Sequence, residues 1–517
     1  MPAPSTLPGV LRAAAEAAPH AEALVAGEVR LTFADLRDRV LAFSRAALAE
    51  GIRPGDRVAV WAPNTDRWAV AALGLVSVGA VLVPVNTRYK GEEAHDVLAR
   101  TGASLLVVDD GFLGAGRVAM LEAQPPLPDL RTVVRTDDDA EWDRFVAQGE
   151  RVDSDEVERV ADAVRPTDVS DVIFTSGTTG RPKGVMVTHE QSVRTFATWA
   201  RTVGLREGDR MLVVAPFFHT FGYKAGLLAC LLQRATAVPV PVLDVDAVLG
   251  LVAHERISVV PGPPTLYATI LEHPAHGEYD LSSLRLAVTG ASVVPTELIR
   301  RMREELGFDT VLTAYGLTEC TGYATGCRQG DPDDVVGLTS GRAVEGVEVR
   351  VVDEQGADVP TGQPGEVLVR GFNVMVGYWQ DDEATAEAID VDGWLHTGDV
   401  GVLDAAGNLR ITDRIKDMYV VGGFNAYPAE VEQVLVRHDG VSEAAVFGVP
   451  DDRLGEVGRA LVVPRAGATL DPGELIAFCK ERLAGFKVPR SVAVVDSLPR
   501  NATGKIDKKL LREEARR

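Results

Sequence analysis

The sequence predicts an α/β protein of two or more domains. Short apolar strands alternate with amphipathic helices through most of the first part of the chain, which is typical of mostly parallel sheets covered by helices. From about residue 341 apolar and polar residues alternate between Gly, Pro and Asp turns, which predicts short antiparallel strands. With 517 residues, the chain is too long for one compact core.

The expected helices and strands follow from the spacing of apolar residues and from glycines that end helices. In the first part, helices are expected at 35–48 and 68–78 and strands at 58–61, 81–83 and 104–108. An acidic, weakly patterned stretch at 135–168 is interpreted as a solvated loop-and-helix excursion without a catalytic role. Strand–helix alternation resumes at 172–311, and antiparallel strands are expected at 347–352, 365–370 and 408–412.

The last part of the chain predicts a small α/β unit. It has expected helices at 428–437 and 472–483 and strands at 444–449 and 460–463. The charged step at 413–417 separates two patterned regions, so the domains are predicted as 1–413 and 414–517.

Composition narrows the range of possible functions and locations. A formal net charge of −22 argues against non-specific binding to nucleic acid or to anionic membranes. The four cysteines, Cys230, Cys320, Cys327 and Cys479, are scattered, which favours reduced thiols in a cytosolic protein. The N-terminus lacks the features of a signal peptide, and the apolar run 68–85 is broken by Gly74, Gly79 and Pro84. We therefore expect a cytoplasmic protein without a membrane span.

The strongest chemical signal is Thr175–Gly184, directly after an apolar strand. Its members are Thr175, Ser176, Gly177, Thr178, Thr179, Gly180, Arg181, Pro182, Lys183 and Gly184. Hydroxyls, glycines and a lysine at this density predict a loop whose backbone N–H groups surround phosphate oxygens. The spacing excludes a Walker loop, and the alternative is a plain glycine-rich turn.

This loop and the motifs that follow it resemble the acyl- and aryl-CoA synthetases, the superfamily shared with firefly luciferase and the adenylation domains of peptide synthetases. The further motifs stand at 313–319 (TAYGLTE), 394–399 (WLHTGD), 413–416 (DRIK), 422–430 (GGFNAYPAE) and 499–505 (PRNATGK). The resemblance implies a large N-terminal body with a small β-barrel-like subdomain, followed by a mobile α+β C-terminal domain. It also implies two half-reactions, in which a carboxylate and ATP give an acyl-adenylate, and coenzyme A then takes the acyl group.

By resemblance, the nucleotide is bound by the phosphate loop and by a second group: Thr313, Ala314, Tyr315, Gly316, Leu317, Thr318, Asp399 and Arg414. Glu319 and Thr175 are expected to hold Mg²⁺. Tyr315 would stack on adenine, with a core aromatic as the alternative. Asp399 would accept hydrogen bonds from the ribose, with a bare Gly-Asp turn as the alternative.

By resemblance, the C-terminal motifs take part in the change from the first half-reaction to the second. Lys505 is expected to bridge the carboxylate and the α-phosphate during adenylation. Lys416 matches the hinge, and Gly422 and Gly423 would line the pantetheine tunnel, because close backbone approach needs the smallest residue. The CoA sulfur is the nucleophile, so Cys320 is expected only to pack.

The acyl pocket is expected to be roomy and mostly apolar. Its predicted walls are His219, Phe221, Tyr223, Lys224, Pro263, Tyr267, Gly290, Ala291 and Gly322. His219 is assigned to the acyl/CoA junction, with a structural histidine as the alternative. Lys224 either steers a polar group of the acid or has a surface role.

Several segments, among them 217–231 and 259–275, resemble one actinobacterial branch of the superfamily. Its members activate the propionate side chain of the bicyclic hexahydroindanone acid left by steroid degradation, so this acid is the expected substrate. A medium-chain fatty acid is the alternative. An amino-acid-activating domain, a luciferase-like oxygenase and a non-catalytic nucleotide-binding regulator are less favoured, and the regulator would be expected to lack Lys505 or Glu319. A homodimer is also considered.

Overall fold

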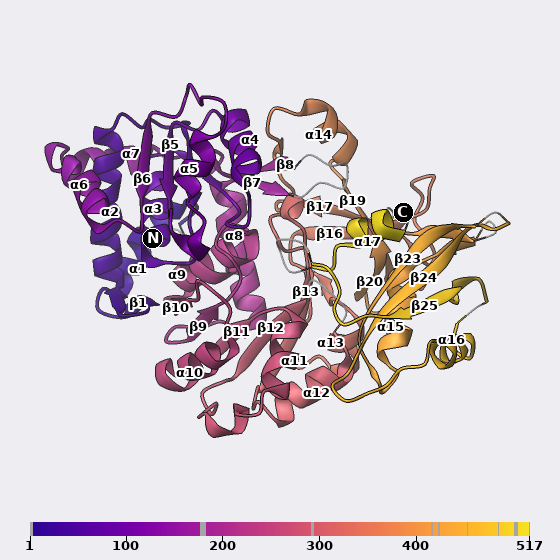
Figure 1. Cartoon of the computed structure of the whole chain (residues 1–517). Coiled ribbons are helices and arrows are strands. Elements are labelled where there is room, and N and C mark those ends of the chain that lie inside the picture. The colour runs from indigo at the N-terminus through magenta and orange to yellow at the C-terminus, as the bar shows by residue number, and fades with distance from the viewer. Residues whose placement is uncertain are drawn as a thin grey trace. The chain divides into compact units, whose positions relative to one another are not determined.

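The computed structural model describes residues 4–175, 182–290, 294–414, 417–421, 424–451, 453–483, 485–500 and 505–515 (Figure 1). The chain divides into two compact units, Met1–Val349 with Val369–Leu395, and Arg350–Leu368 with His396–Arg517. The predicted parallel sheets, antiparallel strands and small terminal α/β unit are all present, so the predicted fold class is confirmed.

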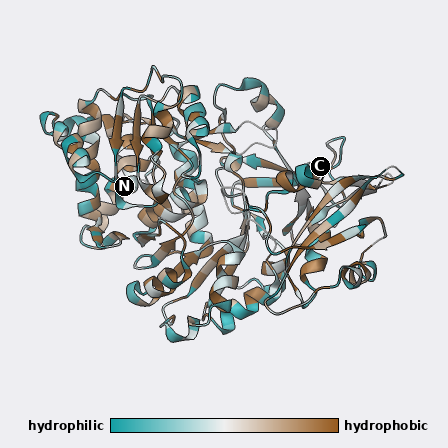
Figure 2. Cartoon of the chain, in the orientation of Figure 1, coloured by the Kyte–Doolittle hydropathy of each residue, from teal (hydrophilic) through white to brown (hydrophobic). Residues whose placement is uncertain are grey.

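A seven-stranded sheet forms the first half of the first unit, in the order β18-β8-β7-β4-β3-β5-β6. Strands β3 to β7 pair in parallel, whereas β8 runs antiparallel to β7 and β18 antiparallel to β8. The bounds are β3 (Arg57–Trp61), β4 (Val81–Pro84), β5 (Leu105–Val108), β6 (Thr132–Arg135), β7 (Val169–Thr175), β8 (Lys183–Thr188) and β18 (Gly377–Tyr378). Strands β3, β4 and β5 are almost wholly apolar and buried, as expected of strands covered on both faces (Figure 2).

A nine-stranded sheet follows in the order β15-β14-β13-β12-β11-β9-β10-β1-β2. The six central strands are parallel and the strands at both edges are antiparallel. The bounds are β1 (Glu22–Ala26), β2 (Val29–Thr32), β9 (Arg210–Val213), β10 (Thr236–Pro239), β11 (Val259–Pro261), β12 (Leu286–Gly290), β13 (Thr310–Tyr315), β14 (Thr325–Gly326) and β15 (Arg342–Ala343). Strands β12 and β13 run in parallel and end side by side, with Gly290 opposite Ala314 in the register.

Helices cover both sheets, and several begin with the capping residues that the sequence offers. Thr32 caps α2 in a reciprocal box with Asp35, and Thr188 caps α8 in the same way with Gln191. The helices are α1 (Leu7–Ala17), α2 (Phe33–Ala49), α3 (Asp66–Ser77), α4 (Gly91–Thr101), α5 (Arg117–Glu122), α6 (Asp139–Ala147), α7 (Ser154–Ala163), α8 (His189–Val203), α9 (Ala229–Gln233), α10 (Val245–Glu255), α11 (Pro264–Glu272), α12 (Thr296–Glu304), α13 (Asp333–Leu338) and α14 (Asp382–Ala388). A π-helix, Phe221–Leu228, precedes α9.

The acidic stretch 135–168 is less solvated than predicted. It forms α6 and α7, and Trp142 and Phe145 of α6 are buried. Both rings lie 5.2 Å from the ring of Phe43 on α2, measured between centroids. Two aromatic side chains thus anchor a stretch whose charge pattern alone indicated a solvated excursion.

The second unit contains a five-stranded sheet, in the order β22-β21-β24-β23 with β25 beside β24. The bounds are β21 (Tyr419–Val421), β22 (Phe424–Ala426), β23 (Val441–Asp451), β24 (Gly455–Pro464) and β25 (Ser491–Val494), with helices α15 (Pro428–Val436), α16 (Pro472–Lys480) and α17 (Lys508–Ala515). Apolar residues of α15, α16 and β24 form its core. A four-stranded sheet holds, in this order, β16 (Val347–Val352), β17 (Gly365–Gly371), β19 (Leu395–Leu403) and β20 (Leu409–Arg414), and β19 and β20 are antiparallel.

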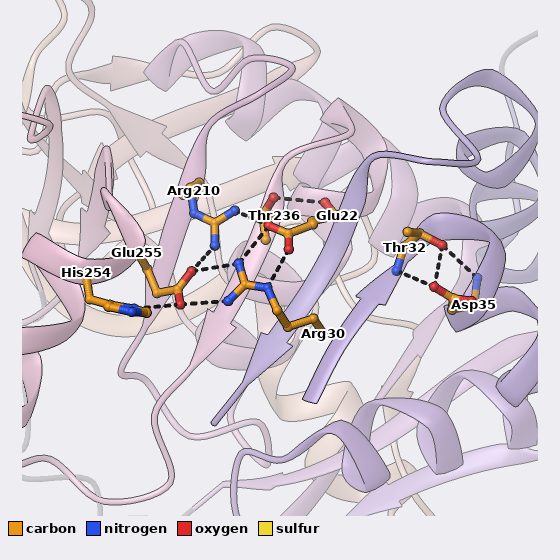
Figure 3. A network of polar contacts seen from close by, with 8 residues as sticks. All are labelled: Glu22, Arg30, Thr32, Asp35, Arg210, Thr236, His254 and Glu255. Atoms are coloured by element: carbon orange, nitrogen blue, oxygen red, sulfur yellow. Dashed lines mark hydrogen bonds and ion pairs between the residues drawn. The ribbon is translucent and has the colours of Figure 1, made fainter. Parts of the chain in front are cut away.

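A network of charged side chains links the N-terminal hairpin, β1 and β2, to strand β9 and helix α10 (Figure 3). Arg30 of β2 binds Glu22 of β1 at 2.7 Å and Glu255 of α10 at 2.8 Å. Arg210 of β9 binds the same two carboxylates. Hydrogen bonding from Arg30, aided by the charge of Arg210, lowers the pKa of Glu255 from 4.5 to about 2. These four residues therefore stabilise the hairpin while Glu255 stays ionised.

The Glu255→Gln variant is expected to lose stability at neutral pH and to lack the part of the acid destabilisation that Glu255 contributes below pH 5. Because the folded-state pKa is depressed, the contribution of Glu255 is complete above its unfolded value and disappears as the pH falls from 4.5 towards 2. The shift corresponds to roughly 3 kcal/mol. Thermal midpoints measured from pH 7 to pH 3 would test this.

The matched control is Glu207→Gln, which breaks a more exposed pair with Arg234. Surface pairs of that kind contribute about 0–1 kcal/mol, so this variant should unfold nearly like the wild type. Equal effects of the two substitutions at pH 7 would contradict a special role for Glu255.

Candidate active site

The base of the predicted phosphate loop is a pair of adjacent strand ends. Strand β7 ends at Thr175, and β8 begins at Lys183, directly opposite it in the antiparallel register. The Thr175 hydroxyl donates to the carbonyl oxygen of Lys183 at 3.5 Å. Thr175 and Lys183 therefore lie side by side where the loop leaves and re-enters the sheet. The other predicted phosphate-binding residues, Ser176, Gly177, Thr178, Thr179 and Gly180, lie outside the described residues.

Tyr378 lies between Lys183 and Glu319, the predicted magnesium ligand. Its hydroxyl donates to Glu319 Oε1 at 3.0 Å, and its ring centroid lies 4.9 Å from the Lys183 ammonium nitrogen. Burial, followed by the charge of Glu319, raises the pKa of Tyr378 far above its usual value. The phenol is therefore a neutral donor to a carboxylate. We did not predict Tyr378, because only the pairing of β18 with β8 brings it to this place.

The 313–319 motif runs from strand β13 into a short turn, Thr318–Cys320. The Thr313 side chain is buried and lies 2.8 Å from the carbonyl oxygen of Val336, so it is held inside the fold. Tyr315 at the strand end is half-buried, which does not fit the alternative of a core aromatic. Cys320 is buried and its thiol lies 3.3 Å from the Leu317 carbonyl oxygen, as expected of a packing residue.

Two glycines let the nucleotide motif approach the predicted acyl segment. A Cβ on Gly316 would lie 2.3 Å from the carbonyl oxygen of Gly322, a distance that real side chains do not adopt. Gly322 itself has φ +86°, and a Cβ there would lie 2.7 Å from the Thr220 methyl group. The backbone of 316–322 therefore packs against the segment that carries His219.

His219 is half-buried at the start of the π-helix. Its Nδ1 accepts a hydrogen bond from the Phe221 amide at 3.2 Å, so the neutral ring carries its proton on Nε2. Phe221 packs edge-on against Trp199, with the ring centroids 6.1 Å apart. The local bond orients the imidazole, and it is compatible both with the junction role and with the structural alternative.

Lys224 has a partner that the sequence did not reveal. Its ammonium lies 2.8 Å from Asp171 Oδ1 on β7, and both side chains are 0% exposed. Burial lowers the pKa of Lys224, and the charge of Asp171 opposes that shift. The surface alternative for Lys224 is wrong. Tyr223 is also fully buried and packs edge-on against Trp68, 5.5 Å between centroids.

The remaining predicted wall residues of the acyl pocket differ in position and burial. Gly290 ends β12 beside Ala314 of β13, and a Cβ on Gly290 would lie 2.9 Å from the Ala314 carbonyl oxygen. Tyr267 instead lies fully buried in α11, with its hydroxyl bonded to the Val260 carbonyl oxygen at 2.5 Å. Pro263 is exposed at the start of α11, and Ala291 lies outside the described residues.

In the second unit, Asp399 and Arg414 stand opposite one another. Asp399 is buried on β19 and its register partner on β20 is Arg414, whose side chain is not described. Asp399 lies within a strand, so the bare-turn alternative does not fit. Lys505 is exposed next to Ile506, which bridges to Arg500. Lys416, Gly422 and Gly423 lie outside the described residues.

The donor set fits a magnesium ion that arrives with a nucleotide. Among the described residues, no group of three His, Cys, Asp or Glu side chains could hold a metal. Mg²⁺ in nucleotide enzymes is commonly held by one or two carboxylates together with substrate phosphates and water. Glu319, whose carboxylate accepts a hydrogen bond from the Tyr378 hydroxyl, would supply one hard oxygen ligand of that kind.

The family model described as "AMP-binding enzyme" matches residues 11–379, and its C-terminal domain model matches residues 430–505. The chain belongs to the AMP-binding enzyme family. The predicted membership of the adenylate-forming acyl-CoA synthetases is thereby confirmed.

The chain is similar to two ligases that are both named 3-[(3aS,4S,7aS)-7a-methyl-1,5-dioxo-octahydro-1H-inden-4-yl]propanoyl:CoA ligase. It is 54% identical to the one from Rhodococcus jostii, over 99% of each chain, and 53% identical to the one from Mycobacterium tuberculosis, over 98% of each chain. The predicted likeness to the steroid-degradation branch is confirmed.

Solved structures of family members share this fold. The anthranilate CoA ligase AuaEII with anthranoyl-AMP has a TM-score of 0.86 at 28% identity, covering 99% of this chain and 97% of that one. ATP-bound MatB from Rhodopseudomonas palustris has a TM-score of 0.84 at 29% identity, covering 99% and 98%. Within the described part of the chain, none of the helices has the length and apolar character to cross a membrane.

Proposed function

We propose that this protein is an ATP-dependent acid–CoA ligase that activates the hexahydroindanone propanoate of steroid degradation. The observation that carries the proposal is the identity of 54% and 53%, over nearly whole chains, to two ligases named for that acid. The arrangement of Lys183, Tyr378 and Glu319 at the base of the phosphate loop supports the adenylation half-reaction.

The chemistry has two steps. A carboxylate oxygen attacks the α-phosphorus of ATP and pyrophosphate leaves, so negative charge accumulates at the phosphates. Lys183 supplies a cation and Glu319 a metal ligand where that charge gathers, which is how preorganised electrostatics lowers such a barrier. The CoA sulfur then attacks the acyl carbonyl carbon and AMP leaves, and no side chain of the enzyme need act as a nucleophile.

The proposal includes a mobile C-terminal domain, residues 414–517, that rotates about Lys416 between the two steps. It brings Lys505 to the substrates for adenylation and then presents Gly422 and Gly423 to the pantetheine. We also propose a cytoplasmic location, where thiols stay reduced. The proposed assembly is a homodimer, which light scattering of the purified protein would check.

A ligation screen tests the substrate. AMP release with and without CoA should be highest for the hexahydroindanone propanoate, with kcat/KM about 10–200-fold above that for octanoate, since an apolar pocket discriminates by ~1–3 kcal/mol for each group that fits poorly. A preference for octanoate would instead support the medium-chain alternative. The human medium-chain ligase ACSF2 is 33% identical over 98% of this chain, which makes octanoate the appropriate comparison.

A further inference from the structure

A single segment, 373–379, contacts both predicted phosphate-site elements in the first unit. On one side, Tyr378 pairs with Val185 of β8, and the Trp379 amide donates to the carbonyl oxygen of Gly184 at 2.7 Å. These bonds fix the segment to the strand that begins at Lys183.

On its other side, the same segment is bonded to the turn that carries Glu319. The Met375 amide donates to the carbonyl oxygen of Glu319 at 2.8 Å, and the Thr321 hydroxyl donates to that of Asn373 at 2.7 Å. Backbone and side-chain bonds thus hold the acidic turn and the basic strand end to one short segment.

Tyr378 extends this link to the functional groups themselves. Its side chain is 8% exposed, with the hydroxyl on the Glu319 carboxylate and the ring face towards the Lys183 ammonium. A hydrogen bond to an ionised carboxylate is about twice as strong as a neutral one. An ammonium over the face of a largely desolvated ring is also attracted by the negative potential of that face. One side chain therefore restrains both an anion and a cation.

We propose that Tyr378 is the positioning residue of the adenylation site: its hydroxyl sets the Glu319 carboxylate for Mg²⁺, and its ring sets the Lys183 ammonium for the phosphates. This inference rests on the proposed function. A carboxylate that is already oriented loses less conformational freedom when it binds the metal, so Tyr378 raises magnesium affinity without touching the acid or CoA.

Two substitutions separate the two contacts. Tyr378→Phe removes only the hydroxyl, whereas Tyr378→Leu also removes the ring. In ATP–pyrophosphate exchange, Tyr378→Phe should raise the Mg²⁺ concentration for half-maximal rate by about 10–100-fold, the usual cost of losing a partner of a metal ligand. Its KM for ATP at saturating Mg²⁺ should change little. Tyr378→Leu should show the same Mg²⁺ shift together with a higher KM for ATP.

The rate of thioester formation from supplied acyl-adenylate serves as the internal control. In both variants it should stay within about twofold of the wild-type rate, because this step needs neither the contact of Tyr378 with Glu319 nor that with Lys183. Trp379→Phe is the matched control: it removes an adjacent indole donor to the Arg100 carbonyl oxygen and should leave the Mg²⁺ dependence unchanged.

The outcomes separate failure of the proposed function from failure of the positioning role of Tyr378. A wild-type enzyme that fails to exchange pyrophosphate with any acid would sink the proposed function itself. An active wild type whose Tyr378→Phe variant is folded and has an unaltered Mg²⁺ dependence would overturn the positioning role alone. A merely structural role would lower both half-reactions together and leave the Mg²⁺ midpoint in place.

Discussion

The Lys505→Ala variant is expected to lose adenylation while it keeps most of its ability to transfer the acyl group from a supplied acyl-adenylate to CoA. In the first half-reaction two negatively charged groups, the carboxylate and the α-phosphate, must approach each other, and a positioned cation offsets their repulsion. Removing one such electrostatic contact commonly costs about 10²–10³-fold in rate. The second half-reaction starts from a neutral acyl carbonyl and does not need that cation.

The surroundings of Lys505 make the substitution interpretable. Lys505 is exposed, and two basic side chains near it in sequence, Arg500 and Lys508, have defined partners within the second unit. Arg500 pairs with Glu443 at 2.6 Å, and Lys508 pairs with Glu432 at 2.8 Å. Alanine at 505 should therefore leave the fold of this unit intact.

Single-turnover rates of the two half-reactions test the role, with Lys480→Ala as the control. Lys480 is an exposed lysine at the end of α16 in the same unit, so its loss changes net charge equally without touching the motif at 499–505. An equal fall of both half-reactions in Lys505→Ala would contradict the bridging role. So would an equal loss of adenylation in Lys480→Ala.

Local sequence signals predicted the fold better than they predicted side-chain partners. The helix at Phe33–Ala49 follows from its period and from the Thr32–Asp35 cap, both of which lie within the element itself. The phosphate loop stays a prediction from its contiguous hydroxyls, glycines and lysine, and the structure places Thr175 and Lys183, at its two ends, in register.

The side-chain contacts that the sequence did not predict share one physical cause: they join residues far apart in the chain. Tyr378 meets Glu319 only because a two-residue strand pairs with β8, and a strand that short has no periodicity to detect. The sequence places Trp142 and Phe145 in a charged stretch, but their burial depends on where α2 places Phe43. In each case the decisive partner comes from another element.

Lys224 shows the same limit most clearly, and it leads to the second large expected effect. Lys224→Met should destabilise the first unit by about 3–5 kcal/mol, because it leaves the carboxylate of Asp171 buried without its counter-ion. Removing both charges should cost much less: Lys224→Met with Asp171→Leu should recover most of the loss, since buried pairs are often replaced by apolar groups with little penalty. Urea unfolding of the full-length single and double variants measures the coupling.

The pair also links two parts of the predicted site, so activity provides a second test. Asp171 lies on the strand that ends at Thr175, and Lys224 lies in the π-helix that follows His219. A shift of that helix should raise KM for the acid in Lys224→Met, and the double variant should restore it in part. Arg300→Met, which breaks exposed pairs with Glu297 and Glu304, is the control and should change stability by less than about 1 kcal/mol. Additive effects of the Lys224 and Asp171 substitutions would show that the two charges do not depend on each other.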